Sequence, residues 1–425
     1  MSYSIDEIKH KACQHKTLIQ NFSYLSALQA FNMLVPLIIY PYLIRVLGKE
    51  TYGLVVFVQA IVAYLVILVE FGFNTSATRE ISLHRNNKEK LNEIVSSVLI
   101  IKSVHFLLVS LLMGLLIRVI PKAHGYELLF VLSMWTCLYE VIFPTWYFQG
   151  IEQMKYITYI TLISRLIFLG LIFVFIKSPS DYLFVPLING IGALVAGLIA
   201  LFIILGKQKI VFEWQPFSKL KYYFFNSVPL FFSNLFISIY TSTNKVIVGF
   251  FLGLEEVAYY DLAEKVTTAL KVPQNILSQS LFPKNSKDRD IGFIKRVFKL
   301  SVIFHVALFL LVLLFSKPII LVLGGEQMLP ARTILIILAL TVPVIAMSNI
   351  FGIQVLIAFG YNKVFSRVIM ISVLAYLVQL LPLWIITGFS TVGISVVTLI
   401  TEIFVCVSLF YYCKKLNLWP QKRTI

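Results

Sequence analysis

The chain has 425 residues, of which 59% are hydrophobic and only 13% are charged, and its mean hydropathy is +0.88. These values exclude a soluble globular protein of this length and indicate an integral membrane protein. The net charge of +16 would also suit a nucleic-acid-binding protein. The distribution of the basic residues, described below, accounts for that charge without nucleic acid. The four cysteines lack metal-type spacing, and we expect neither a metal site nor a cofactor.

Long apolar runs follow one another along the whole chain. They are nearly uncharged and end at Gly, Pro or Lys/Arg clusters, which indicates membrane-spanning helices rather than barrel strands. The first run is too long for a signal peptide and has no cleavage site. We therefore predict an all-α integral membrane protein with about twelve transmembrane helices. They are expected at residues 18–47, 52–74, 93–119, 127–148, 154–176, 182–205, 222–252, 257–282, 298–315, 333–359, 364–387 and 392–412.

A polar linker at residues 206–221 divides the predicted helices into two groups of six. The two halves look like repeats, because LGKE at 47–50 recurs as LGLE at 252–255 between the first two helices of each half. An even number of helices per half makes the repeats parallel and predicts alternating access by rocking of the halves. The expected organisation is a cytoplasmic segment 1–17, a lobe 18–205, the linker 206–221, a lobe 222–412 and a cytoplasmic tail 413–425.

The basic residues orient the chain in the membrane. Of the 36 Lys and Arg residues, six lie deep inside the predicted helices. Of the other 30, 24 lie on the loops, tails and helix ends of one side and only six on those of the other side. Cytoplasmic loops carry the excess of Lys and Arg, so both termini are predicted to be cytoplasmic. The six residues on the opposite side are Lys49, Arg118, Lys122, Lys177, Lys317 and Arg332.

Charged residues inside the predicted helices are candidates for function. A charge in hydrocarbon is costly and needs a cavity or a partner. Arg165 lies roughly 16 Å past Met154 along a helix, near the middle of a ~30 Å hydrocarbon core. The charges nearly balance, so internal pairing that only holds helices together, such as Arg165 with Glu140, remains an alternative. The set consists of Arg45, Lys102, Arg165, Lys245, Lys265, Lys271, Glu70, Glu140, Asp261, Glu264 and Glu402.

Two consecutive predicted helices, 222–252 and 257–282, carry polar stripes at helical spacing. The second stripe runs over roughly 26 Å, nearly the thickness of the hydrocarbon core, which favours a water-filled cavity. Asp261 and Lys265 are four residues apart and can pair. Glu264 then has Lys271 or Lys245 as a partner, or acts in ion coupling, for which Asp261, Glu140 and Glu70 are the other candidates. The predicted cavity-lining polar residues are Asn234, Ser238, Thr241, Thr268 and Asn275.

Three motifs carry a family resemblance. They are Tyr42–Gly48 with Tyr52-Gly53, Glu70-Phe71-Gly72 to Arg79-Glu80, and Trp146–Glu152 leading to Arg165. With them the whole chain resembles the Wzx-type O-antigen flippases, a polysaccharide-transporter branch of the superfamily that includes multidrug extruders and the lipid II flippase. The resemblance implies two six-helix lobes in a MATE-like V. The family's usual acidic residue in the seventh helix is not evident, and Asn244-Lys245 stands there.

The resemblance implies a cargo and its partners. It implies transport of a polyprenyl-diphosphate-linked oligosaccharide from the cytoplasmic to the periplasmic leaflet of the bacterial inner membrane. Arg and Lys suit a diphosphate. The expected partners are this lipid-linked sugar, membrane lipid, H+ or Na+, and the O-antigen polymerase and assembly proteins. We predict that Arg165, Lys245, Lys102, Lys265, Arg45 and Lys271 bind the diphosphate.

Two other functions stay open at this stage. A drug or cation antiporter of the same architecture would favour an acidic cavity, whereas Arg165, Lys102 and Lys245 favour an anion. A membrane polysaccharide polymerase, ligase or glycosyltransferase would usually need a sizeable outside loop with catalytic residues. The longest outside segment, residues 316–332, offers no His and no pair of acids. We therefore expect a transporter and not an enzyme.

The charge distribution predicts which loops face the cytoplasm. In a variant without its native cysteines, a single cysteine at Lys209 should react with a membrane-impermeant thiol reagent only after the cells are opened. A cysteine at Lys122 should react in intact cells. Labelling of position 209 from outside would refute the topology of twelve helices with cytoplasmic termini.

Overall fold

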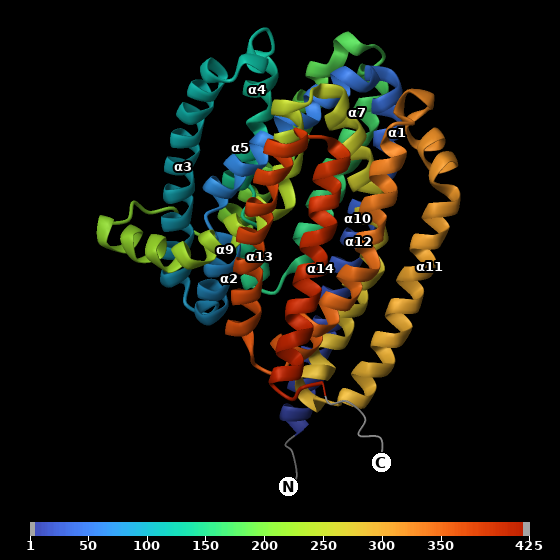
Figure 1. Ribbon diagram of the computed structural model, residues 1–425. Coiled ribbons are helices and arrows are strands. Elements are labelled where there is room, and N and C mark those ends of the chain that lie inside the picture. Colours follow the sequence, from blue (N-terminus) through green and yellow to red (C-terminus); the bar gives the residue numbers. More distant parts are fainter. Residues whose placement is uncertain (1–4, 420–425) are drawn as a thin grey trace, which may run out of the picture. The chain divides into compact units, whose positions relative to one another are not determined.

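The computed structural model describes the backbone of residues 5–419 (Figure 1). The predicted cavity residue Thr241 lies outside the described side chains, as do the outer ends of the two predicted terminal segments. The other side chains that are not described are most of those in residues 5–34, and those of Leu37, Ile237, Tyr240, Pro283 and Thr387.

The regular structure within residues 5–419 is entirely helical, as predicted. Each predicted span coincides with a helical stretch, and nine of the described helical stretches are long and apolar enough to cross a membrane. The protein is therefore an all-helical, multi-pass membrane protein. The α-helices are α1 (Ile5–Glu70), α2 (Phe73–His84), α3 (Lys88–Val119), α4 (Glu127–Ser133), α5 (Trp135–Ile142), α6 (Thr145–Gly150), α7 (Met154–Phe175), α8 (Phe184–Phe202), α9 (Phe217–Phe251), α10 (Leu254–Asp288), α11 (Ile291–Gly324), α12 (Ala331–Asn349), α13 (Asn362–Pro382) and α14 (Thr391–Lys415).

Shorter turns extend or connect these helices. Three of them are π-helical and continue α8, α12 and α13, where a wider turn leaves some backbone carbonyls without their usual partner. The others are 3-10 turns in the loops. The π-helical turns are η3 (Ile203–Lys207), η5 (Ile350–Ile357) and η6 (Leu383–Thr387), and the 3-10 turns are η1 (Pro121–Ala123), η2 (Pro179–Leu183) and η4 (Glu326–Met328).

The chain forms two compact units, which do not coincide with the predicted lobes. The first unit contains residues 1–48 and 58–238, and the second contains residues 49–57 and 239–425. The division therefore falls inside α9, not in the linker at 206–221, and a short piece of α1 belongs to the second unit. The six-helix lobes and their boundaries stay a prediction.

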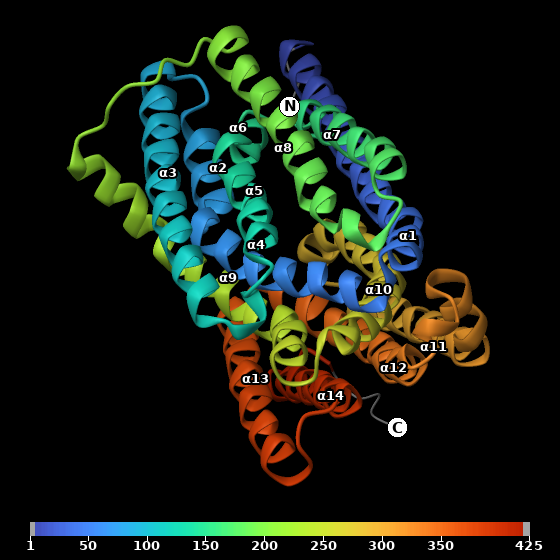
Figure 2. The same cartoon turned by 90° about the horizontal axis from the view of Figure 1, so that it is seen from above.

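In the first unit, α3 packs against α2 and α5, and α8 packs against α5 and α7 (Figure 2). The linker lies along α3. The backbone N–H of Val211 donates to Asn92 Oδ1, and that of Glu213 donates to Ser96 Oγ, both at 3.0 Å. Two helix side chains thus satisfy backbone groups of a segment that has no secondary structure of its own, and they hold the linker in place.

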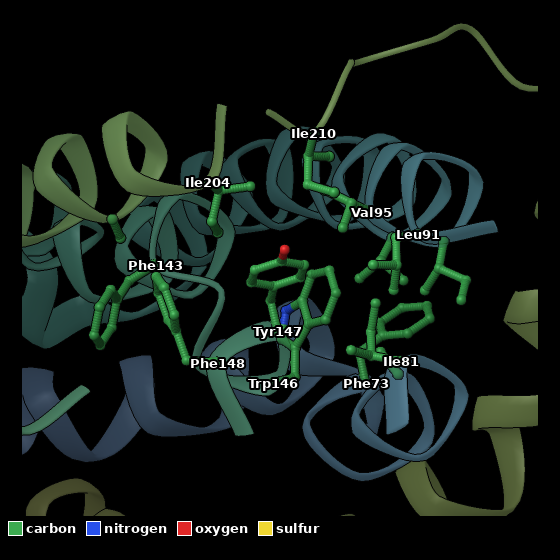
Figure 3. Packing of buried hydrophobic residues seen from close by; sticks show 14 of the residues in the cluster. Phe73, Ile81, Leu91, Val95, Phe143, Trp146, Tyr147, Phe148, Ile204 and Ile210 are labelled. Carbon is green, nitrogen blue, oxygen red and sulfur yellow. The ribbon is translucent and has the colours of Figure 1, made fainter. Parts of the chain in front are cut away.

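The core of the first unit contains the Trp146-Tyr147-Phe148 motif. All three side chains are buried, and Figure 3 shows Trp146 on the side of Phe73 and Ile81 of α2 and Phe148 beside Phe143. The next motif residue, Gly150, leaves no room for a side chain, because a Cβ would lie 2.4 Å from Ile81 Cγ2. The motif therefore packs α6 against α2, and its aromatic rings are not available to stack on a sugar.

In the second unit, α12 lies among α10, α11 and α14 (Figure 1). Buried amides connect these helices. Gln274 of α10 bonds to Asn349 and to Ser301, and Gln354 bonds to Asn285. Amide and hydroxyl groups that satisfy one another across helices stabilise their packing inside a membrane protein.

The predicted repeat has a counterpart in the backbone. Gly48 has φ 75° and ψ 166°, and Gly253 has φ 123° and ψ 170°. Both values lie in a region that only glycine occupies without strain, and each glycine begins a new helical direction. The residues that follow them meet, because Lys49 Nζ lies 2.7 Å from Glu255 Oε2. The similar geometry at these two positions supports the parallel repeat.

The start of this second direction of α1 packs tightly on α10. A Cβ built on Gly53 would lie 1.8 Å from the carbonyl oxygen of Leu254 and 3.4 Å from the backbone nitrogen of Ala258. Real Cβ atoms do not approach backbone this closely, so the two helices cross at this glycine. Gly53 and Ala258 are also 205 residues apart, which is the repeat offset of the LGKE and LGLE motifs.

The crossing predicts that Gly53→Ala destabilises the protein. The added methyl must push α10 away, and overpacking of this kind costs ~1–3 kcal/mol. We expect a lower midpoint of thermal denaturation for the purified variant in detergent. Gly114→Ala on α3 is the matched control, because a Cβ there meets nothing within 4 Å and alanine favours a helix. Equal midpoints for Gly53→Ala and the parent would contradict the packing described here.

Candidate functional site

A buried ionic network, which we call the Asp261 cluster, lies in the second unit. It consists of Asp261, Glu264 and Lys265 of α10, Lys245 of α9 and Tyr52 of α1. The Asp261 side chain is only 1% exposed. Its Oδ2 lies 2.5 Å from Lys265 Nζ, and its Oδ1 lies 3.4 Å from Lys245 Nζ. The predicted pairing of Asp261 with Lys265 is confirmed.

Lys245 lies between two carboxylates. Its Nζ lies 2.6 Å from Glu264 Oε2, in addition to the contact with Asp261. Of the two partners that the sequence left open for Glu264, the structure therefore selects Lys245. Each of the two lysines keeps 21% of its side chain exposed, and Glu264 keeps 25%. The network is electrically neutral, and both lysine side chains remain partly exposed.

Tyr52 completes the cluster and was not expected from the sequence. Its hydroxyl donates to Asp261 Oδ2 at 2.6 Å and accepts from Lys265 Nζ at 2.7 Å. The same ammonium lies 5.3 Å from the centre of the tyrosine ring, within the range of a cation–π contact. A buried tyrosine hydroxyl needs a polar partner. The sequence could therefore predict that a buried Tyr52 has a polar partner. It could not show that Asp261 would be that partner.

The residues around Asn244 hold α9 beside this cluster. The Asn244 amide donates to the Tyr260 hydroxyl at 2.7 Å and to Thr398 Oγ1 at 3.0 Å, and it accepts from the Tyr376 hydroxyl. These partners come from α10, α13 and α14. Four helices thus meet at a neutral amide, where the family resemblance leads one to expect an acid. This arrangement fixes the position of the neighbouring Lys245.

A second ion pair lies in the first unit and is of a different kind. Lys102 of α3 is fully buried. Its Nζ lies 3.6 Å from Glu140 Oε2 and donates to the backbone carbonyl of Glu140 at 2.9 Å. The pair joins α3 to α5, and the ammonium is not accessible to a ligand. Lys102 and Glu140 therefore match the alternative of internal pairing.

Glu70 also has structural partners. Its carboxylate accepts from the backbone N–H groups of Gly72 and Asn74, both at 2.9 Å, and from Asn234 Nδ2 at 3.2 Å. A carboxylate at a helix start satisfies free N–H groups and is favoured by the helix dipole. Glu70 thus stabilises the beginning of α2, and Asn234 supports it from α9.

The other predicted basic residues differ in exposure. Arg165 is exposed in the middle of α7, and the described part of the chain gives it no ion pair. Glu140, its suggested structural partner, is paired with Lys102 instead. Arg45 is exposed on α1, and Lys271 is half-buried on α10. Three of the six predicted cargo residues belong to the first unit and three to the second, and their common site stays a prediction.

The predicted polar stripes are not uniformly accessible. Ser238 is half-buried, whereas Thr268 and Asn275 are exposed. Ser278, at the end of the α10 stripe, is buried and accepts from Gln354 Nε2 at 2.9 Å. The end of the stripe thus contributes to helix packing. Within the described residues, no group of three or more His, Cys, Asp or Glu side chains is arranged to hold a metal ion.

Comparison with known proteins connects this arrangement to a family. The model of the polysaccharide biosynthesis protein family matches residues 18–288. The chain is 29% identical, over 92% of its length and 95% of the relative, to an Escherichia coli (strain K12) protein named "Putative O-antigen transporter". It is 26% identical to a Shigella dysenteriae protein of the same name, over 91% of this chain and 97% of the relative.

Solved structures show the same fold at low sequence identity. The lipid II flippase MurJ in an inward closed conformation superposes with a TM-score of 0.75 and 16% identity, over 93% of this chain and 89% of that one. An inward-facing multidrug resistance MATE family transporter of the MOP superfamily gives a TM-score of 0.69 and 13% identity, over 91% and 98%.

These similarities confirm the resemblance inferred from the sequence motifs. The family match covers more than half of the chain, and the two fold relatives belong to the expected kind of helical membrane protein. The chain therefore belongs to the polysaccharide biosynthesis protein family and has the MurJ- and MATE-type helical fold.

Proposed function

We propose that the protein is a flippase that moves a polyprenyl-diphosphate-linked oligosaccharide, an O-antigen repeat unit, across the bacterial inner membrane. It carries the sugar from the cytoplasmic to the periplasmic leaflet by alternating access. In this proposal the chain crosses the membrane twelve times, forms two six-helix lobes in a V and keeps both termini in the cytoplasm. The proposal takes the cargo class from the names of the relatives and from the chemistry of the Asp261 cluster.

The observation that carries the proposal is the pair of partly exposed lysine side chains in α9 and α10. Lys245 and Lys265 lie in helices proposed to span the membrane, and each keeps 21% of its side chain exposed. A positive charge at that depth is costly unless it has a function. Two lysines within reach of the same carboxylate offer a site for a doubly charged anion, and a diphosphate is such an anion.

The chemistry of the cargo explains why a protein is needed. A diphosphate and a hydrated glycan cannot cross hydrocarbon, whereas a polyprenyl chain is apolar and dissolves in it. The protein must therefore offer polar and basic groups to the head of the cargo while its tail stays in lipid. H+ or Na+ is the proposed coupling ion, with Glu264 and Asp261 as the groups that exchange it. The O-antigen polymerase and assembly proteins are the proposed protein partners.

A drug or cation antiporter is the less favoured alternative. Such a protein needs an accessible carboxylate for the cation. Both carboxylates of the Asp261 cluster contact lysine ammonium groups, and Glu140 and Glu70 contact Lys102 and helix N–H groups, respectively. Together with the family match, this pairing favours an anionic cargo.

Arg165 provides a test of the cargo site. Loss of one charge-assisted hydrogen bond, worth ~1.5–3 kcal/mol, should weaken cargo capture about tenfold or more. In cells without the native gene, we expect Arg165→Ala to reach normal membrane abundance with little surface glycan, and Arg165→Lys to keep part of the export. Arg367→Ala, an exposed arginine on α13, is the control and should export normally. Normal export by Arg165→Ala would remove Arg165 from the site.

Lys102 should behave in the opposite way. Breaking a buried ion pair by removal of one partner costs ~3–5 kcal/mol, because the other charge is left without compensation. We expect Lys102→Ala to lower both the membrane abundance and the thermal midpoint. The double variant Lys102→Met with Glu140→Gln should recover much of both, since no buried charge remains. Normal abundance of Lys102→Ala with a selective loss of export would instead place Lys102 in the cargo site.

A further inference from the structure

Residues 49–57 form a segment of α1 that we call the α1 bridge. Its flanking residues in α1 belong to the first unit, but the bridge itself belongs to the second. Three of its residues attach it to α10. Gly53 packs against the backbone of Leu254, Lys49 pairs with Glu255 and donates to the Tyr259 hydroxyl at 3.3 Å, and Tyr52 bonds to Asp261 and Lys265. Any separation of the bridge from α10 has to break these contacts.

The three contacts differ in strength. The Lys49–Glu255 pair has side chains that are 36% and 45% exposed, and exposed ion pairs contribute little. The Gly53 crossing is a packing contact without a polar bond. The Tyr52 hydroxyl, in contrast, bonds to a carboxylate that is 1% exposed, and hydrogen bonds to buried charged groups are the strong ones. Tyr52 is therefore the principal polar attachment of the bridge.

The same groups that hold Tyr52 would also bind the cargo. Lys265 donates to Tyr52 and pairs with Asp261 Oδ2, while Lys245 pairs with Asp261 Oδ1 and with Glu264. Two ammonium groups are thus shared by two carboxylates and one hydroxyl. Each Nζ group has three donors and contacts two acceptors of the cluster, so an anion that takes more than one hydrogen bond from an ammonium group displaces part of these contacts.

We propose that a diphosphate anion and the α1 bridge compete for the Asp261 cluster, so that binding of the anion loosens the bridge from α10. This inference rests on the proposed function. It adds a cause for the opening of the transporter towards the periplasm. The anion draws Lys245 and Lys265 towards itself. Tyr52 then loses the hydrogen bond and the cation–π contact that Lys265 gives it, and of these polar contacts only its bond to Asp261 still holds the bridge on α10.

The position of the bridge indicates on which side of the membrane the contact is released. In the predicted topology, residues 49–57 and 254–258 lie at the periplasmic ends of their helices. Cargo that arrives from the cytoplasm would then release a contact on the periplasmic side. Without cargo the cluster re-forms and holds the bridge closed. Opening is thus tied to occupancy of the site.

Linkage makes the proposal quantitative. If the anion weakens the bridge contact, then loss of the bridge contact must strengthen anion binding by the same factor. Tyr52→Phe removes the hydroxyl and keeps the ring, so it should raise the affinity for the anion about threefold to tenfold. Tyr223→Phe is the matched control. Its hydroxyl also bonds to a carboxylate, Glu93, at 2.9 Å, but it belongs to the first unit.

The experiment uses the full chain in lipid nanodiscs with spin labels on cysteines at Glu50 and Phe251. Both positions are exposed and belong to the second unit. Farnesyl diphosphate is the probe and farnesol the uncharged control. Binding is measured by calorimetry and the label separation by pulsed electron paramagnetic resonance. We expect farnesyl diphosphate, but not farnesol, to add a longer distance in the parent and in Tyr223→Phe. Tyr52→Phe should show the longer distance without probe and bind the probe more tightly.

A second variant separates binding of the anion from release of the bridge. Glu264→Gln removes a competitor of Lys245 without touching Tyr52. It should bind the probe more tightly and keep the short distance until the probe is added. Binding of the probe with an unchanged distance in the parent would overturn the competition and leave the proposed function intact. Absence of any farnesyl diphosphate binding by the folded parent would count against the proposed cargo site itself, and an equal response to farnesol would also overturn the competition.

Discussion

The burial of Asp261 is the constraint on which the second unit depends. A carboxylate that is 1% exposed inside a helix proposed to cross the membrane must have its charge compensated and its oxygen atoms hydrogen-bonded. Two lysines and one tyrosine do this, and they come from three separate parts of the chain, α1, α9 and α10. The need to satisfy one charge therefore brings together the bridge and the two helices that carry these lysines.

Exposure separates the Lys102–Glu140 pair from the Asp261 cluster, although the two look alike in the sequence. Lys102 and Glu140 form a pair whose ammonium is fully buried, and the pair holds two helices together. Lys245 and Lys265 have more contacts, but each keeps a fifth of its side chain accessible. A buried pair gains its stability from being complete, while an accessible pair can exchange one partner for a ligand of the same charge. Only the second kind suits a site that binds and releases an anion.

The motifs that carry the family resemblance mark packing constraints more than contacts to cargo. Trp146, Tyr147 and Phe148 lie in the core of the first unit, Gly150 fits against Ile81, and Gly53 fits against the backbone of Leu254. Tyr52 connects the two kinds of constraint, since it lies beside Gly53 and bonds to Asp261. In a membrane protein the apolar side chains can face lipid anywhere, so close helix contacts depend on such small residues and on polar bonds.

The sequence by itself determined the class of protein, most of its helical stretches and the Asp261–Lys265 pair. These follow from hydropathy, from helical spacing and from the sign of charges, which are all local properties of the chain. The tertiary structure decided which charges meet. It paired Glu264 with Lys245 and Glu140 with Lys102, made Glu70 a helix cap, brought Tyr52 to a carboxylate 209 residues away and placed the bridge with the second unit. Partners that distant in sequence depend on how helices rotate and cross, and neither periodicity nor composition contains that information.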